Sequence, residues 1–156
     1  MLYFTADQHH GHENIIEYCN RPFINSVQMT RRIIQNHNNV VNEDDICYHL
    51  GDFIWGKDVN RLTEILRRMN GMNILILGNH DEMNPFQYVK AGFESVHTSL
   101  NVADMLLIHD PAVAVMTKQT VLCGHVHGLF EKCKNAVNVG VDMRDMRPVS
   151  ISDLKV

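Results

Sequence analysis

The sequence lacks the spaced cysteine pairs of a zinc knuckle. Its four cysteines, at positions 19, 47, 123 and 133, include no Cys-x-x-Cys pair. That absence argues against a structural zinc site built on thiolates. Cys47 and Cys123 lie inside apolar runs, so we expect buried, reduced thiols there. We therefore assign the cysteines no functional role.

The sequence also has no membrane-spanning segment, signal peptide or lipidation motif. No apolar run in it approaches the roughly 20 residues that cross a bilayer, and the chain enters a strand-like run at Leu2. We therefore expect a cytoplasmic protein with no membrane partner. The formal net charge of -4 provides no general attraction to nucleic acid, but it leaves a nucleic-acid substrate open.

The chain has 156 residues, so residues 1–156 are expected to fold as a single domain with a sizeable core. Periodic apolar residues in the first half predict alternating strands and helices. In order, the expected elements are a strand over 2–6, a helix from Asn25 or Ser26 to about Val40, a strand over 45–50, a helix from Asp58 to Met69, and a strand over 73–77. This β-α-β-α-β order implies parallel strands with right-handed crossovers.

The second half changes character, because its strands are short and their connections are brief. We predict these strands over 93–97, 102–108, 120–123 and 136–139. Such a pattern favours a second sheet that is mostly antiparallel or mixed. The sequence therefore predicts an α/β fold of two sheets with helices outside them.

Histidine is present in excess, with ten residues in the chain. Several of them belong to five short polar clusters, each of which follows a strand-like run. The clusters are Asp7-Gln8-His9, Gly51-Asp52, Gly78-Asn79-His80-Asp81, His109 and Gly124-His125-Val126-His127. In open α/β sheets, ligands gather beyond the carboxyl ends of the strands. We therefore expect these side chains to meet at one rim of the fold.

The clusters offer carboxylate and amide oxygens and imidazole nitrogens, which suit divalent manganese, iron, zinc or nickel. We expect two such cations, about 3.5–4 Å apart, to share Asp52 and a bridging hydroxide that attacks a phosphoester. His80 directly follows the candidate ligand Asn79 and points elsewhere, which leaves it free to protonate or stabilise the leaving oxygen. Asp81 either orients His80 or has a structural role.

Each cluster also has an ordinary structural interpretation when it is taken alone. The His125–His127 pair is of a kind that is often two surface or core histidines. Asp52 can be a helix-capping or turn residue, and Gly78-Asn79 suits a turn at a strand exit. A single structural zinc explains the whole set poorly, because seven ligand positions exceed the four that such a site uses.

In chain order the clusters form D-x-H, G-D, G-N-H-D, H and G-H-x-H. This order, over the chain from Asp7 to His127, resembles that of the calcineurin-like metallophosphoesterase superfamily. Segments 5–16 and 138–142 are similar to a small bacterial and phage branch of that superfamily. The resemblance implies a four-layer α/β/β/α sandwich. It also implies Asp7, His9 and His127 on one metal ion, Asn79, His109 and His125 on the other, Asp52 as the bridge, and His80 as a catalytic histidine that binds no metal.

The chain departs from that pattern after Asp52. Many larger members carry G-D-x-x-D-R-G, where the second Asp steadies the catalytic histidine and the Arg grips phosphate. Here Trp55 stands at the Asp position and Gly56 at the Arg position. Candidates for the phosphate clamp are Lys57, Arg21 and Arg144. Trp55 is either a loop anchor or a platform for a base or sugar, and Asp142 is a candidate to hold a ligand histidine in place.

The expected function is hydrolysis of phosphomonoesters or phosphodiesters, with manganese as the first expectation for the metal. The competing hypothesis is a scaffold that keeps the fold and has lost turnover. Such a scaffold usually loses ligands or the catalytic histidine, whereas all seven ligand positions and His80 are present here. Monoesters, diesters, cyclic nucleotides, nucleotide polyphosphates and RNA ends all suit these residues, and the oligomeric state cannot be read from the sequence.

Overall fold

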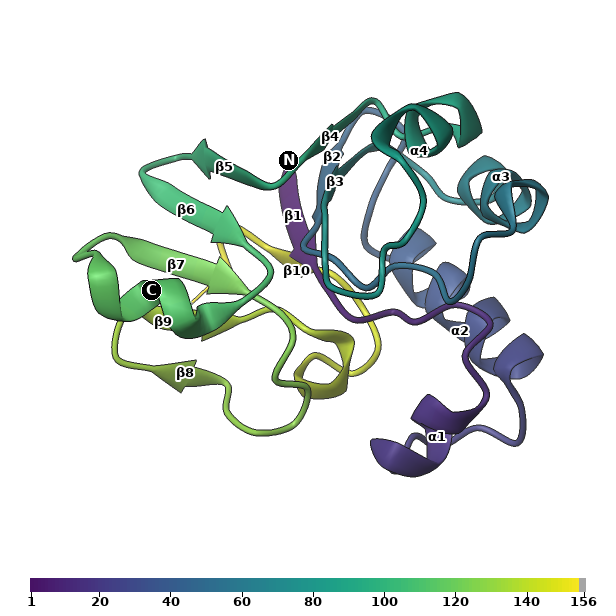
Figure 1. Cartoon of the computed structure of the whole chain (residues 1–156), viewed down its shortest axis with the longest axis horizontal. Coiled ribbons are helices and arrows are strands. Elements are labelled where there is room, and N and C mark those ends of the chain that lie inside the picture. Colours follow the sequence, from purple (N-terminus) through teal and green to yellow (C-terminus); the bar gives the residue numbers. More distant parts are fainter. Residues whose placement is uncertain (155–156) are drawn as a thin grey trace.

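Two mixed five-stranded sheets form the centre of the molecule (Figure 1). The computed structural model describes residues 1–154. Helices cover the outer face of the first sheet, and a short 3-10 helix lies on the outer face of the second (Figure 1). The layers are therefore helix, sheet, sheet and helix, which confirms the expected four-layer α/β/β/α sandwich.

The first sheet is built mainly of parallel strands joined through helices. Its order is β10 (Val149–Ser150), β1 (Leu2–Thr5), β2 (Ile46–His49), β3 (Met72–Ile76) and β4 (Ser95–His97), with only β10 antiparallel to its neighbour. The predicted β-α-β-α-β order is confirmed. The segment 93–97, which we expected in the second sheet, instead supplies the fourth parallel strand of the first. The unpredicted helix α4 (Pro85–Ala91) provides the crossover that brings it there.

The second sheet mixes parallel and antiparallel pairs, as the short strands predicted. Its order is β5 (Ser99–Val102), β6 (Met105–Ile108), β7 (Thr120–Cys123), β9 (Ala136–Asn138) and β8 (Lys132–Cys133). The strand expected over 102–108 is in fact the β5–β6 hairpin. Ala103 and Asp104, with φ of 47° and 63°, form its two-residue turn, because both central residues of such a turn adopt left-handed φ.

The main helices begin where polar side chains cap them. The helices of the first-sheet side are α1 (Asn14–Tyr18), α2 (Ser26–Asn38), α3 (Val59–Arg67) and α4, and the 3-10 helices are η1 (Pro111–Met116) and η2 (Val141–Met143). The Asn25 side chain accepts the Gln28 N–H at 2.8 Å, and the Asp58 side chain accepts the Arg61 N–H at 3.0 Å. Each cap satisfies a backbone donor that the first helical turn leaves free.

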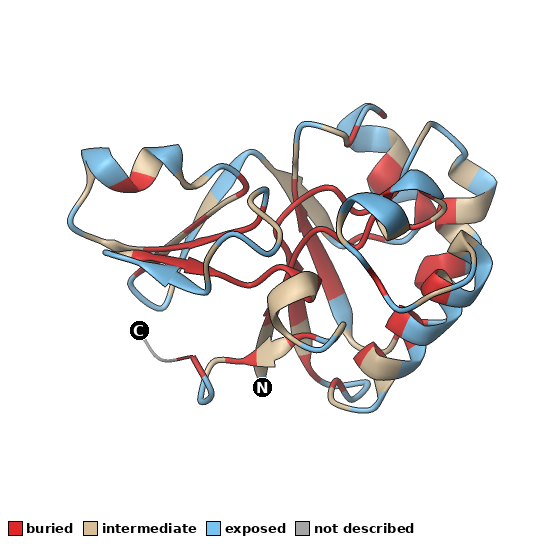
Figure 2. Cartoon of the chain, turned by 90° about the horizontal axis from the view of Figure 1, so that it is seen from below, coloured by how far each residue is buried: buried red, intermediate tan, exposed pale blue. Residues whose placement is uncertain are grey.

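The main hydrophobic core lies between the two sheets. Its buried members are Phe4, Ala6, Tyr48, Leu50, Ile74, Ile76, Met105, Leu107, Leu122, Val137, Val139 and Leu154. A second core packs beneath α3 and α4, and Figure 2 shows buried residues along the strands and on the inner sides of the helices. Among the helices of residues 1–154, none is long and apolar enough to cross a membrane.

Leu122→Ala is expected to destabilise the fold by roughly 2–5 kcal/mol, because it opens a cavity between the sheets. The Leu122 side chain is fully buried, whereas the matched control Leu129→Ala alters a side chain that is 78% exposed. Urea unfolding midpoints measure both changes. Equal midpoints for the two variants would contradict the placement of Leu122 in the core.

Candidate metal centre

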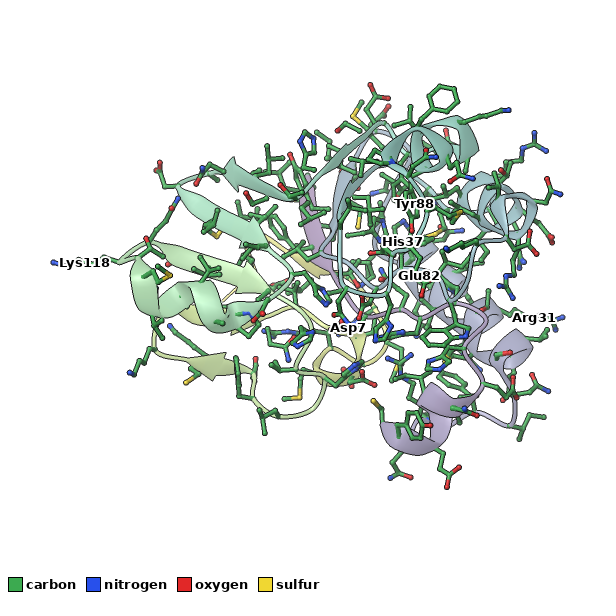
Figure 3. The ribbon with its side chains drawn as sticks, viewed as in Figure 1. Asp7, Arg31, His37, Glu82, Tyr88 and Lys118 are labelled. Atoms are coloured by element: carbon green, nitrogen blue, oxygen red, sulfur yellow. The ribbon has the colours of Figure 1, made fainter. Side chains whose placement is uncertain are left out.

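The polar clusters meet at one rim because the strands that precede them end there. Backbone bonds continue beyond the strands, from the Asp7 N–H to the Gly51 carbonyl at 3.0 Å and from the His9 N–H to the Asp52 carbonyl at 2.9 Å. In the second sheet the Gly124 N–H donates to the His109 carbonyl at 3.1 Å. Figure 3 shows Asp7 where the two sheets adjoin. All five predicted clusters therefore come together in space.

The rim is held in a strained backbone conformation. Five of the seven candidate ligands have φ in the left-handed region, namely Asp7 (60°), His9 (51°), Asp52 (54°), His125 (72°) and His127 (46°). Non-glycine residues seldom adopt this region, and each instance costs of order 1–3 kcal/mol. Such strain concentrates at functional sites, where surrounding structure over-determines it. The strained backbone directs the side chains of these five residues at a cost in stability.

One set of ligand atoms is already close enough to share a cation. Asn79 Oδ1 lies 3.0 Å from His109 Nε2 and 2.9 Å from His125 Nδ1, and the two nitrogens are 3.3 Å apart. Ligands about 2.1 Å from one metal ion are typically separated by about 3 Å. The His109 Nδ1–H donates to the Leu50 carbonyl at 2.7 Å, which leaves the lone pair of Nε2 free to bind a metal.

The second set, Asp7, His9 and His127, contains groups that no other part of the protein satisfies. Its ligand atoms lie within 4.8 Å of one another. Both ring nitrogens of His9 are buried without a hydrogen-bond partner among the described residues. Burial raises the pKa of Asp7 to about 6 and lowers the pKa of His9 to about 3. Buried polar groups without partners are costly, so this set fits a bound cation.

Asp52 lies between the two sets. Its Oδ2 is 3.5 Å from His9 Nε2 and 3.4 Å from His109 Nε2. Its Oδ1 accepts the backbone N–H of His80 at 2.8 Å, so the carboxylate cannot rotate freely. One oxygen of Asp52 therefore faces a nitrogen from each set, in the position that a bridging ligand requires.

His127 is oriented by a buried ion pair. Its Nδ1–H donates to Asp142 Oδ2 at 2.8 Å, which directs Nε2 toward a metal position. The Arg21 guanidinium binds Asp142 through two bonds of 2.8 Å and also donates to the carbonyls of Asp7 and Gln8. This geometry agrees with the expectation that Asp142 holds a ligand histidine in place. Arg21, named as a clamp candidate, is instead a buried positioning residue.

The other two clamp candidates are also engaged. Lys57 Nζ lies 3.7 Å from Glu82, and Arg144 binds Glu131 at 2.7 Å and the Asn138 carbonyl. Lys57 and Glu82 are both exposed, so the Lys57 ammonium stays accessible to solvent. Lys57 and Arg144 therefore stay predictions as phosphate-clamp residues.

His80 has an aromatic rather than a carboxylate neighbour. Its ring is 5.6 Å from that of His9 and 5.2 Å from that of Trp55, measured between centroids. Within residues 1–154 the ring of His80 has no hydrogen-bond partner. Trp55 stacks on His12 at 3.8 Å, and its carbonyl accepts a bond from Arg61 at 2.8 Å. This geometry favours the loop-anchor interpretation of Trp55.

Asp81 has the structural role that the sequence left open. Its carboxylate accepts the backbone N–H groups of Asp52 at 2.8 Å, Phe53 at 3.0 Å and Gly78 at 2.8 Å. These bonds tie the loop after β2 to the loop after β3. Asp81 therefore aligns Asp52 with Asn79 and does not hold the His80 ring.

Two glycines allow these loops to approach each other. Gly51 has φ of +93°, and a Cβ there would lie 2.5 Å from His109 Nδ1. A Cβ on Gly78 would overlap the carboxylate of Asp52. Both positions therefore require glycine for close approach, which explains why a glycine precedes Asp52 and Asn79.

Comparison with known proteins places the chain beside one curated relative. Uncharacterized protein MJ1445 of Methanocaldococcus jannaschii is 34% identical over 160 residues, which cover 96% of this chain and 86% of that protein. The chain belongs to the MJ1445 family. No family model matches it.

A solved structure also has the same fold as this member of the MJ1445 family. The protein of unknown function AQ665 from Aquifex aeolicus matches with a TM-score of 0.75 and 26% identity, over 96% of this chain and 94% of that one. The match spans both sheets, so the two proteins share the whole sandwich. Neither name assigns an activity, so the function rests on the residues of the rim.

Asp142→Asn is expected to weaken binding of one Mn²⁺ by about 10–100-fold, because it removes the charge that orients His127. The amide keeps an acceptor beside Arg21, which limits structural damage. The matched control is Asp145→Asn, at a carboxylate that is 90% exposed. Calorimetric titration with Mn²⁺ measures both variants. Unchanged affinity in Asp142→Asn would rule out the positioning role.

Proposed function

We propose that this protein is a phosphoester hydrolase of the calcineurin-like metallophosphoesterase type that uses two divalent metal ions. The observation that carries the proposal is the position of Asp52 Oδ2, within 3.5 Å of a nitrogen from each of the two ligand sets. A carboxylate shared by two metal sites is the arrangement that two-metal hydrolases use. A single structural zinc would use only one of the two ligand sets.

Seven residues would hold the metal ions. Asp7, His9 and His127 would bind one ion, Asn79, His109 and His125 the other, and Asp52 both. When bound, the ions would lower the pKa of a water molecule to make it a nucleophile and would neutralise the charge of the phosphate. Oxygen and imidazole donors suit manganese first, with iron, zinc or nickel as alternatives.

The remaining residues of the rim would serve the substrate. His80 is half-buried, and its backbone N–H is fixed by Asp52 at 2.8 Å. Its ring is free of other bonds and can deliver a proton to the leaving oxygen. The metal ions, when bound, would supply positive charge at the rim to bind the phosphate.

The rim has a small cleft beside one of the two ligand sets. A cleft of about 240 Å³ lies beside Asn79, His109 and His125. Phosphomonoesters and phosphodiesters, nucleotides among them, can reach such a site with the rest of the molecule outside it. Nucleic-acid ends remain compatible for the same reason.

Protein loaded with Mn²⁺ is expected to hydrolyse an aryl phosphomonoester or a bis-aryl phosphodiester. His80→Ala should lower kcat by about 10²–10⁴-fold because the proton donor is lost, while metal content stays the same. The control His97→Ala alters a histidine whose ring contacts Ser95 at 2.9 Å, and it should leave kcat near the parent value. Inactivity of the parent with manganese, iron, zinc and nickel would favour the scaffold hypothesis instead.

Asp52→Asn is expected to lower metal occupancy more than Asn79→Ala. The first change removes a charged oxygen that faces both ligand sets, whereas the second removes one neutral ligand of one set. Elemental analysis after equilibration with Mn²⁺ counts the ions per chain. Equal occupancy in the two variants would show that Asp52 does not serve both ions.

A further inference from the structure

A hollow of about 340 Å³ lies on the outer side of the second sheet, between η1 and the β8–β9 hairpin. Its walls include Ala112, Ala114 and Val115 from the 3-10 helix and Phe130 and Ala136 from the hairpin side. The hollow is thus lined largely by carbon. Ligand pockets of this kind bind apolar rings and use a few polar groups to orient them.

The hollow exists because this layer of the sandwich is thin. Helices α2, α3 and α4 cover the first sheet and α1 packs against α2, whereas only η1 covers the outer face of the second sheet among the described residues (Figure 1). Three of the lining residues are alanines, whose methyl groups leave space that larger side chains would fill. Val115 is 82% exposed at the edge. The outer face of β7 and β9 is therefore only partly covered.

Polar bonds hold the walls in place. The Asn135 amide donates to the carbonyls of Ala114 at 3.1 Å, Thr117 at 3.0 Å and Gln119 at 2.8 Å. Asp110 caps the other end of η1 by accepting the Ala112 N–H at 2.8 Å. Because the hairpin and η1 are bound together, the hollow is formed before any ligand arrives, and binding requires little ordering of the protein.

The hollow adjoins the cleft at the candidate metal centre. Asp110 and His125 line both the hollow and the cleft that contains Asn79 and His109. The His125 side chain is exposed at this junction. A group attached to a phosphate in the cleft can therefore extend past His125 toward the hollow.

The hollow and the leaving-group histidine lie on different sides of the centre. The His80 ring contacts His9 and Trp55, which belong to the first-sheet half. The hollow opens beside His125, which follows β7 of the second sheet. A substrate that uses both positions must carry two ester groups on one phosphorus atom, one that leaves beside His80 and one that is retained.

We propose that the hollow binds the retained ester group of a phosphodiester, and that this group carries a flat apolar ring. The inference rests on the proposed function and narrows its substrate class. In the reaction, one water molecule adds to phosphorus, the bond to the leaving oxygen breaks, and that oxygen takes a proton. The ring remains on the phosphomonoester product.

Two diesters with the same leaving group test the preference. Protein loaded with Mn²⁺ should hydrolyse 2-naphthyl p-nitrophenyl phosphate with a kcat/KM at least about tenfold above that of methyl p-nitrophenyl phosphate, because the ring leaves water on binding. Ala112→Trp fills the hollow and should bring the ratio of the two kcat/KM values near one. The control Met116→Trp adds the same side chain on η1 at a residue that is 84% exposed and does not line the hollow. It should keep the parent ratio.

Direct binding separates this inference from the proposed function. Fluorescence anisotropy of methyl 2-naphthyl phosphate, which needs no turnover, should show about tenfold weaker binding to Ala112→Trp than to the parent or to Met116→Trp. If no ester is hydrolysed but this difference persists, the hollow binds the ring and the hydrolase assignment fails. The role of the hollow would be overturned if the parent and Ala112→Trp bound methyl 2-naphthyl phosphate equally. It would also be overturned if the parent hydrolysed the two diesters with the same kcat/KM.

Discussion

The rim depends on the burial of Asp52 beside two imidazoles. Its side chain is 2% exposed, and one of its oxygens is within 3.5 Å of both His9 and His109. A buried carboxylate is costly unless other groups compensate for it. The protein supplies part of that compensation through the His80 N–H. The rest of the fold can be understood as the framework that brings the remaining donors to this one carboxylate.

In that framework the strained backbone lies at the candidate ligands, and regular strands lie behind it. The strands β1, β2, β6 and β7 are regular and carry the core between the sheets. The backbone becomes left-handed at Asp7, Asp52 and His125, directly beyond the strand ends. Buried bonds from Asp81 and Arg21 hold these loops. The apolar core thus offsets conformations that would not persist in an isolated loop.

Much of this arrangement could be predicted from the sequence because it depends on local patterns. Strand-like runs followed by metal-binding residue types indicated the rim, and parallel topology explained why the clusters meet. The turn at Ala103–Asp104 was missed because Ala103 seldom adopts left-handed φ, although Asp104 is a residue type that tolerates it. The role of Arg21 was also missed. Its partner Asp142 is 121 residues away, and only the folded chain shows that both are buried together.

The two sheets of the sandwich differ in how much of their outer face is covered. The first sheet has a full layer of helices, which buries its outer face and supports Asp7, Asp52 and Asn79 from behind. The second sheet contributes His109 and His125 at the same rim, but within residues 1–154 only one short helix lies outside it. A sheet with a full outer layer suits residues that must not move, because a densely packed interior has low compressibility. A thinly covered sheet leaves space beside His125, and in that space the proposed hydrolase would recognise the shape of its substrate.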